Sequence, residues 1–178
     1  PNNRPPARAA RVNHIRADEA EEAPEVVLGI LHVNHIPAKV LFDTGASHSF
    51  ASQAFAQMHD LSFESMSNGL SVTSPGVQMY SSKISLDNEI QIGGHIFLAS
   101  LIILGNSDID VILGMDWLKA NQAKIDCSTK TVTLSHPSGQ IVYYPNQTSS
   151  AQLFALNVLP LPAMEDIPVV RDFSDVFP

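Results

Sequence analysis

The sequence contains little cysteine, few basic residues and no long apolar run. Among its 178 residues there is one cysteine, Cys127, so no disulfide can form within the chain. This usage is typical of a reducing compartment, and we expect an intracellular, cytoplasmic protein. No stretch approaches the roughly 18 consecutive apolar residues of a membrane helix, so we expect no membrane partner.

Basic residues are scarce outside the N-terminus. Four of the ten Lys and Arg residues lie among the first sixteen positions, where there is no Asp or Glu. The other six stand against eighteen acidic residues, which leaves the rest of the chain with a net charge of −12. Phosphate binding depends on a density of basic groups that is missing here, so nucleic acid is not an expected partner of the folded part.

Composition divides the chain into three segments. Residues 1–24 begin with an Arg-, Pro- and Ala-rich stretch and end in acidic residues, which predicts a disordered linker. In residues 25–145, short apolar or alternating runs separated by turn residues predict one mostly β domain. Residues 146–178 are rich in Pro and Ser and predict an extended linker.

Period-2 alternation dominates the central segment, and helical spacing is limited to two places. We expect helices over Ser49–His59 and Asp116–Asn121. Gly93-Gly94 and Ser138-Gly139 stand between alternating runs and predict two-residue hairpin turns. The expected strands are Val26–Val33, Ile36–Phe42, Leu70–Val72, Val77–Ile84, Glu89–Ile92, His95–Ile103, Val111–Leu113, Ala123–Asp126, Thr131–Leu134 and Ile141–Tyr144.

One carboxylate lies at a position that suggests a role in acid–base chemistry. Asp43 follows the apolar run Ile36–Phe42 and precedes Thr44 and Gly45, and the glycine permits a tight turn. A carboxylate at the end of a buried strand is poorly solvated, which raises its pKa, whereas turn amides favour its charged form. Such a group can be tuned for acid–base chemistry, although Asp-x-Gly alone also fits an Asx turn that closes a strand.

Two sequence motifs, the first of which contains this carboxylate, together resemble those of a known protein family. The first is Val40–Phe50, with the sequence VLFDTGASHSF, and the second is Asp110–Leu118, with the sequence DVILGMDWL. They lie about seventy residues apart with β pattern between them. Together they resemble the retropepsin-like aspartic proteases, and more closely the protease segment of plant Ty3/gypsy-type retrotransposon polyproteins. The resemblance runs from about Val26 to Tyr144.

This resemblance implies a fold and a set of catalytic residues. The fold would be a closed β barrel or sandwich with one or two short helices, active as a symmetric homodimer. Asp43, Thr44 and Gly45 would be catalytic, with Thr44 tying the two loops of the dimer together across the site. No cofactor is implied, and no His or Cys falls at the spacing of zinc ligands, so we expect no metal.

The resemblance also implies substrate-binding residues. Ala46 would line the substrate site at a place where family members with Ser can donate a hydroxyl to the outer carboxylate oxygen. Ile112 would contact the substrate, while Leu113 and Gly114 would support the catalytic loop. A turn at the tip of a flap would close over the peptide. The residues of this turn are Ser74, Pro75, Gly76 and Val77.

Peptide hydrolysis by this chemistry needs two acids, and the chain supplies one Asp-Thr-Gly. A lone Asp with a pKa of about 3.9 is ionised at neutral pH and has no proton to donate. Two carboxylates about 3 Å apart repel by about 5 kcal/mol at an effective dielectric of about 20, so the pair keeps one shared proton. No other Asp is followed by Thr-Gly or Ser-Gly, so a twin subunit must supply the second carboxylate.

The implied biological role is processing of the protein's own polyprotein in a virus-like particle, with residues 146–178 leading into a reverse transcriptase domain. Two alternatives remain open. One is a catalytically silent retropepsin-like module that dimerises and binds peptides, and the other is a spacer between polyprotein domains. The intact Asp43-Thr44-Gly45 favours the enzyme, because a binding module has no need of a carboxylate there.

Overall fold

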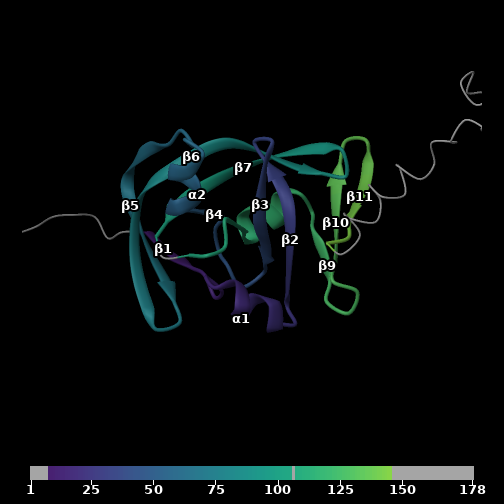
Figure 1. The fold of residues 1–178 in the computed structure, drawn as a ribbon, viewed down its shortest axis with the longest axis horizontal. Helices are drawn as coiled ribbons and strands as arrows, with labels where there is room; N and C mark the ends of the chain where they lie inside the picture. The colour runs from purple at the N-terminus through teal and green to yellow at the C-terminus, as the bar shows by residue number, and fades with distance from the viewer. Residues whose placement is uncertain (1–7, 106, 146–178) are drawn as a thin grey trace, which may run out of the picture. The chain divides into compact units, whose positions relative to one another are not determined.

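The computed structural model describes residues 8–105 and 107–145. These residues form eleven strands and three six-residue helices, so the protein is mostly β, as predicted (Figure 1). The strands are β1 (Arg8–Arg11), β2 (Val26–Val33), β3 (Ile36–Asp43), β4 (Phe50–Ser52), β5 (Glu64–Ser74), β6 (Val77–Ile92), β7 (His95–Leu104), β8 (Val111–Leu113), β9 (Lys124–Asp126), β10 (Thr131–His136) and β11 (Gly139–Tyr143). The helices are α1 (Ala17–Glu22), α2 (Gln53–Met58) and α3 (Met115–Ala120).

Eight strands form one sheet in the order β1-β5-β6-β2-β3-β8-β4-β7, and β7 also pairs with β6. The other three form a sheet in the order β11-β10-β9. β3 and β8 are parallel neighbours, with Val40 opposite Val111 and Phe42 opposite Leu113. This pairing brings the two sequence motifs side by side. The closed barrel or sandwich expected from the sequence stays a prediction.

The β2–β3 hairpin carries Asp43 at its end. β2 matches the predicted strand, and β3 is longer than its prediction by one residue because it includes Asp43. Asn34 and His35 join the two strands with φ values of 49° and 66°, the backbone of a tight hairpin turn. All residues from Val40 to Asp43 are buried, since β2 and β8 flank this end of β3.

Two apolar cores lie on either side of β3. Neighbouring side chains of a strand point to opposite faces, so Phe42 enters the first core and Leu41 enters the second. In the first core, the ring centroid of Phe42 lies 6.0 Å from that of Trp117 and 5.6 Å from that of Tyr143. The second core contains Ala10, Val12, Ala17, Ala20, Ala23, Val26, Leu41, Ala46, Phe50, Leu70, Val72, Ile102, Leu104, Ile109 and Ile112.

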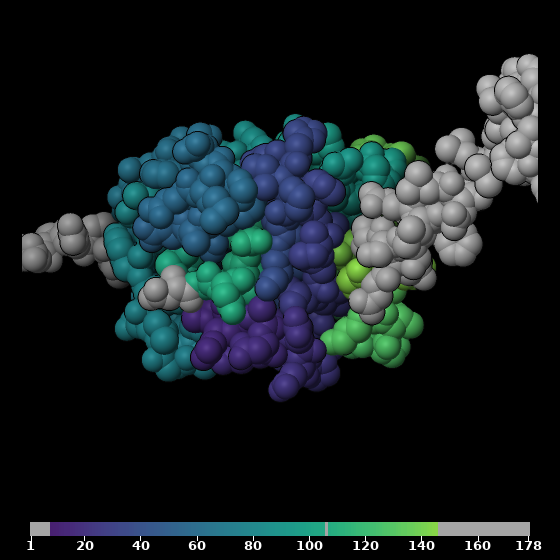
Figure 2. Space-filling view, in the orientation of Figure 1, coloured from purple at the N-terminus to yellow at the C-terminus, as the bar shows by residue number. Residues whose placement is uncertain are grey.

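Residues 8–24 correct the prediction of a disordered linker over 1–24. β1 pairs with β5, α1 packs against the start of β2, and Ala10, Val12 and Ala20 are buried. Figure 2 shows these residues, in purple, packed against neighbouring segments. Average composition failed here because a four-residue strand at a sheet edge satisfies its backbone through pairing and buries only a few small side chains.

The helix predicted over Ser49–His59 begins later than expected. Residues Phe50–Ser52 are the strand β4, and Ser52 caps α2 by accepting a hydrogen bond from the Phe55 amide at 3.1 Å. The sequence pattern could not separate the two because β4 takes its conformation from pairing with β7 and β8. The second predicted helix, α3, is shifted by one residue.

In the part of the chain that the structure describes, no helix has both the length and the apolar composition to span a membrane. The linker predicted for residues 146–178 lies outside the described residues.

Candidate active site

Asp43 lies at the start of a loop, residues 43–49, that we call the active-site loop. Its side chain is fully buried, with 0% exposure. The Gly45 amide donates to Asp43 Oδ1 at 2.7 Å, and the Ala46 amide donates to the Asp43 carbonyl oxygen at 3.2 Å. The chain therefore makes an Asx turn directly after the buried strand, and this turn fixes the orientation of the carboxyl group.

Burial is the largest influence on the Asp43 carboxyl group, and it raises the pKa above the ordinary value of 3.8. The Gly45 amide, the positive charge of a protonated His14 and the His14 amide oppose this rise, while the Glu25 carboxylate adds to it. Oδ2 is buried and accepts no hydrogen bond of ordinary length from the described residues. A buried oxygen without a donor favours the protonated acid, which can donate a hydrogen bond itself.

The second motif holds the active-site loop through Ser49. Ser49 Oγ accepts a hydrogen bond from the Gly114 amide at 3.0 Å and donates one to Asp116 Oδ1 at 2.7 Å. The Ser49 amide donates to Asp116 Oδ2 at 3.2 Å. Ser49 is fully buried, so these bonds connect the loop firmly to the start of α3.

Gly114 is packed so closely against the loop that a larger residue fits only if the backbone of the loop shifts. A Cβ at this position would lie against the His48 carbonyl oxygen and 2.8 Å from the Ala46 carbonyl oxygen. The Ala46 oxygen is itself held, because it accepts a hydrogen bond from the Met115 amide at 2.8 Å. The resemblance implies that Gly114 supports the catalytic loop, and this close packing is how Gly114 would do so.

The other residues predicted for the site have mixed environments. Thr44 is exposed, and within one protomer there is no second loop for it to tie, so that role stays a prediction. Ala46 and Ile112 are 0% and 1% exposed and belong to the second core. Leu113 is buried in the first core. The two predicted substrate contacts, Ala46 and Ile112, are therefore covered by other parts of the chain.

The predicted flap tip is a hairpin turn. Ser74 pairs with Val77 across it, and Gly76 has a φ of 73°, which suits glycine. Pro75 and Val77 are exposed, whereas Ser74 is buried. β1 lies between this hairpin and the active-site loop, and one edge of β1 pairs with β5.

Sequence reasoning missed several residues around the loop. The sequence pattern indicates Ser49 and Asp116 only as the first residues of the two expected helices; their contact spans 67 positions and leaves no local signal. Composition predicts a linker at Arg11, yet the Arg11 amide donates to Ser47 Oγ at 2.8 Å. The alternation of Ala10 and Val12 with polar residues was the signal that could have identified a strand there.

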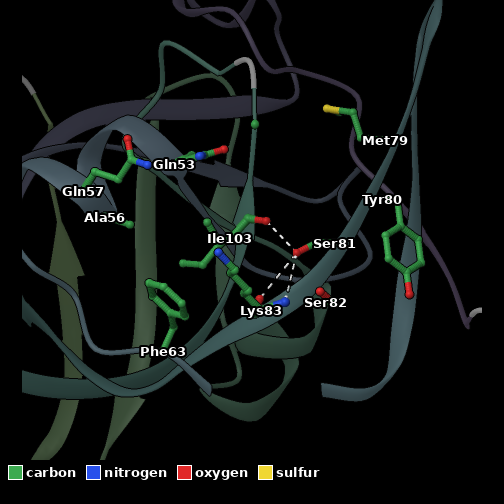
Figure 3. Close-up of a pocket in the computed structure, with 11 residues that line it drawn as sticks. Gln53, Ala56, Gln57, Phe63, Met79, Tyr80, Ser81, Ser82, Lys83 and Ile103 are labelled. Atoms are coloured by element: carbon green, nitrogen blue, oxygen red, sulfur yellow. Dashed lines mark hydrogen bonds between the residues drawn. The ribbon is translucent and has the colours of Figure 1, made fainter. Parts of the chain in front are cut away.

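A surface cavity of about 400 Å³ is separate from the active-site loop. Ser81 Oγ, at its wall, donates to the Ile103 carbonyl oxygen at 2.7 Å, and the Lys83 ammonium lies 4.7 Å from the Phe63 ring centroid (Figure 3). None of residues 43–49 lines it. Within residues 8–105 and 107–145, no three His, Cys, Asp or Glu side chains are placed to share a metal ion.

Comparison with known proteins places this geometry in a family. Residues 7–140 match the family described as retroviral aspartyl protease, which is most of the chain. The chain belongs to this family. In a retroviral aspartyl protease-like domain, the buried Asp43 with its Asx turn, beside the strand β8 and Gly114, is the candidate catalytic centre. The matched region includes β1 and α1, so residues 8–24 are part of the family domain.

Similar proteins agree with this membership. Protein DDI1 homolog 2 of Homo sapiens is 29% identical over 137 residues, which cover 70% of this chain and 33% of that protein. Protein DDI1 homolog 1 of Rattus norvegicus is 28% identical, covering 70% of this chain and 32% of that protein. The chain thus spans about a third of the length of the curated relatives it matches.

A solved structure supports the fold. The crystal structure of the retroviral protease-like domain of Ddi1 from Leishmania major superposes with a TM-score of 0.50 and covers 68% of this chain and 92% of that one. The sequence identity is 17%, so this likeness shows the fold alone.

Proposed function

We propose that this domain is an aspartic endopeptidase that hydrolyses peptide bonds with a pair of Asp43 carboxyl groups, one from each subunit of a homodimer. The observation that carries the proposal is the fully buried Asp43 at the end of β3, held by the Gly45 amide in a retroviral aspartyl protease domain. A buried, raised-pKa carboxyl group is suited to hold a proton at a pH where an exposed Asp is ionised.

The chemistry follows from sharing one proton between two carboxyl groups. The ionised group takes a proton from water as the water attacks the peptide carbonyl carbon, and the protonated group gives its proton to the carbonyl oxygen. When the tetrahedral intermediate collapses, the leaving amine takes a proton from the dyad. Neither step works with one Asp43 alone, because a single carboxyl group cannot be acid and base at once.

The twin subunit is the best source of the second carboxyl group. Oδ2 of Asp43 accepts no hydrogen bond of ordinary length from the described residues, so it would be available to a second carboxyl group once the residues that cover it move away. The sequence holds no second Asp-Thr-Gly. A two-fold symmetric dimer supplies an identical loop at no cost in sequence, and the exposed Thr44 would then reach the partner loop.

The proposed substrate is the polyprotein that contains the domain. The motifs VLFDTGASHSF and DVILGMDWL support an origin in a plant Ty3/gypsy-type retrotransposon, where the domain would cut extended, apolar-flanked sites inside the cell. The hairpin of β5 and β6, which we call the flap hairpin, would lie over the peptide, and the peptide would bind as a strand between it and the active-site loop. Residues 146–178 would then link the protease to a reverse transcriptase domain.

A peptide-binding module without turnover is the second candidate, and one observation favours it. Asp43 is completely covered in the structure, so neither water nor substrate reaches it in this conformation. A fold can persist after its chemistry has been lost.

Cleavage of a degenerate peptide pool separates the two. Purified wild type and Asp43→Asn are incubated with the pool at several pH values, and products are identified by mass spectrometry. The enzyme proposal expects cleavage by wild type only, with both proteins equally dimeric by analytical ultracentrifugation. Equal product patterns from the two proteins, or no cleavage by either, would contradict it, and peptide binding without cleavage would support the binding module.

A further inference from the structure

Residues 8–15, which we call the N-terminal segment, lie along the flap hairpin. β1 pairs in parallel with β5, with Arg8 opposite Leu70 and Arg11 opposite Thr73 (Figure 1). The Val12 amide continues this pairing by donating to the Thr73 carbonyl oxygen at 3.0 Å. The flap hairpin therefore already carries one extra strand.

The opposite edge of the same segment bonds to the active-site loop. The Ser47 amide donates to the Arg11 carbonyl oxygen at 2.9 Å, and the Arg11 amide donates to Ser47 Oγ at 2.8 Å. Arg11 Nε also donates to the Gly45 carbonyl oxygen at 3.3 Å. Successive amides of a strand point to opposite edges, so Arg11 faces the loop while Val12 faces the hairpin. Residues 8–12 of the segment are thus held between the two parts, with β1 as an extended strand.

Side chains of the segment fill the space over the predicted substrate contacts. Ala10 and Val12 are 5% and 0% exposed and pack in the second core, which also contains Ala46, Ile112 and Leu70. Arg11, between these two residues, is exposed, as expected for alternation along a strand, and Arg8 is exposed at the first position of β1. A cavity of about 370 Å³ lined by Arg8 and Leu70 adjoins the start of β1.

The end of the segment covers the catalytic carboxyl group. The amide group of the Asn13 side chain lies so close to Gly45 that a Cβ there would collide with it. His14 lies near enough for its amide and its charge to lower the pKa of Asp43. With the segment in place, Asp43 is 0% exposed, and a second Asp43 cannot approach its Oδ2.

We propose that the N-terminal segment occupies, within its own chain, the groove that receives the peptide substrate. This inference deepens the proposed function and rests on it for the identity of the groove. The ligand class is an extended peptide with small or β-branched aliphatic side chains at two alternating positions, as at Ala10 and Val12. The segment must leave before a substrate or the twin's Asp43 can enter, so it inhibits the closed monomer.

A reversible lock tests this without deleting the segment, because deletion would expose the second core. Arg11→Cys with Thr73→Cys joins two exposed residues that face each other in register, on a Cys127→Ser background. The matched control, Thr73→Cys with Gln78→Cys, crosslinks the flap hairpin to itself and leaves the segment free. Each protein is compared before and after reduction.

Two readouts are needed. The first is cleavage of the peptide pool. The second is binding of a fluorescein-labelled peptide with the sequence of residues 8–15 to the same proteins carrying Asp43→Asn, measured by fluorescence anisotropy. We expect oxidation of the Arg11–Thr73 pair to lower both at least about tenfold, with recovery on reduction and no such loss in the control.

The outcomes separate this inference from the proposed function. Equal cleavage and equal probe binding in the oxidised and reduced forms would overturn the inference, and so would the absence of probe binding to the reduced protein. If no form cleaves but oxidation still prevents probe binding, the groove and its occupant stand while the enzyme proposal fails.

Discussion

Gly114→Ala gives a sharp test of how the second motif supports the active-site loop. The new Cβ would lie against the His48 carbonyl oxygen and 2.8 Å from the Ala46 carbonyl oxygen. Both atoms belong to the backbone, so no side chain can rotate away to make room. Relief requires a shift of the loop, which strains the bond from the Met115 amide to Ala46 and the bond from the Gly114 amide to Ser49 Oγ.

The size of the effect follows from these contacts. Overpacking a close-packed site costs about 1–3 kcal/mol, and each of the two weakened hydrogen bonds adds about 0.5 kcal/mol, so we expect a loss of about 2–4 kcal/mol in the free energy of unfolding. With an m-value of about 2 kcal/mol per molar urea, the unfolding midpoint falls by about 1–2 M. Peptide cleavage should fall as well, since the loop carries Asp43.

Gly105→Ala is the matched control for this experiment. The nearest atom to a Cβ there is Gln53 Oε1 at 3.9 Å, an ordinary contact, so the free energy of unfolding should change by no more than about 0.5 kcal/mol. Urea unfolding followed by circular dichroism compares both variants with wild type. If Gly114→Ala unfolds at the wild-type urea concentration and cleaves normally, the packing argument is wrong.

Three further predictions concern the carboxyl groups. Burial raises the pKa of Asp43, so the contribution of the protonated group to stability is complete below the ordinary pKa of 3.8 and is lost as pH rises through the higher pKa of the folded state. Asp43→Asn should therefore raise the free energy of unfolding at pH 7. Urea titrations should show this gain disappear near pH 3. The resemblance implies that Ala46→Ser would give the outer oxygen of the Asp43 carboxylate a hydroxyl donor, so the pH–rate profile should shift toward acid, and an unshifted profile would count against this role. Asp116→Ala leaves the buried Ser49 hydroxyl without its acceptor and should cost about 2–4 kcal/mol in urea unfolding, whereas Asp116→Asn should lose less than half of that.

Local pattern was enough to predict much of the fold around Asp43. The strands Val26–Val33 and Val111–Leu113 match β2 and β8, because alternation and apolar runs are local consequences of burial. Gly93-Gly94, with positive φ at both residues, forms the predicted turn between β6 and β7. The placement of Asp43 at a strand end, followed by an Asx turn, was likewise predictable, because it depends on consecutive residues.

Features that depend on distant parts of the chain were beyond the sequence pattern. The strand β1 forms because β5 and the active-site loop hydrogen-bond to its two edges, and the short alternation of Ala10 and Val12 is a weak signal beside this pairing. The bond between Ser49 and Asp116 joins residues 67 positions apart. The covering of Ala46 and Ile112 by Val12 has the same origin, since the three come together only in the folded chain.

Mixing wild type with Asp43→Asn tests the shared active site most directly. A fixed amount of wild type is incubated with a ninefold excess of the variant, under conditions where both are dimeric, and peptide cleavage is measured. If each site needs one Asp43 from each subunit, random pairing leaves about a tenth of the wild-type homodimers, and the activity falls about tenfold. Activity that stays unchanged in the mixture would show that one chain carries a complete site, and would contradict the account.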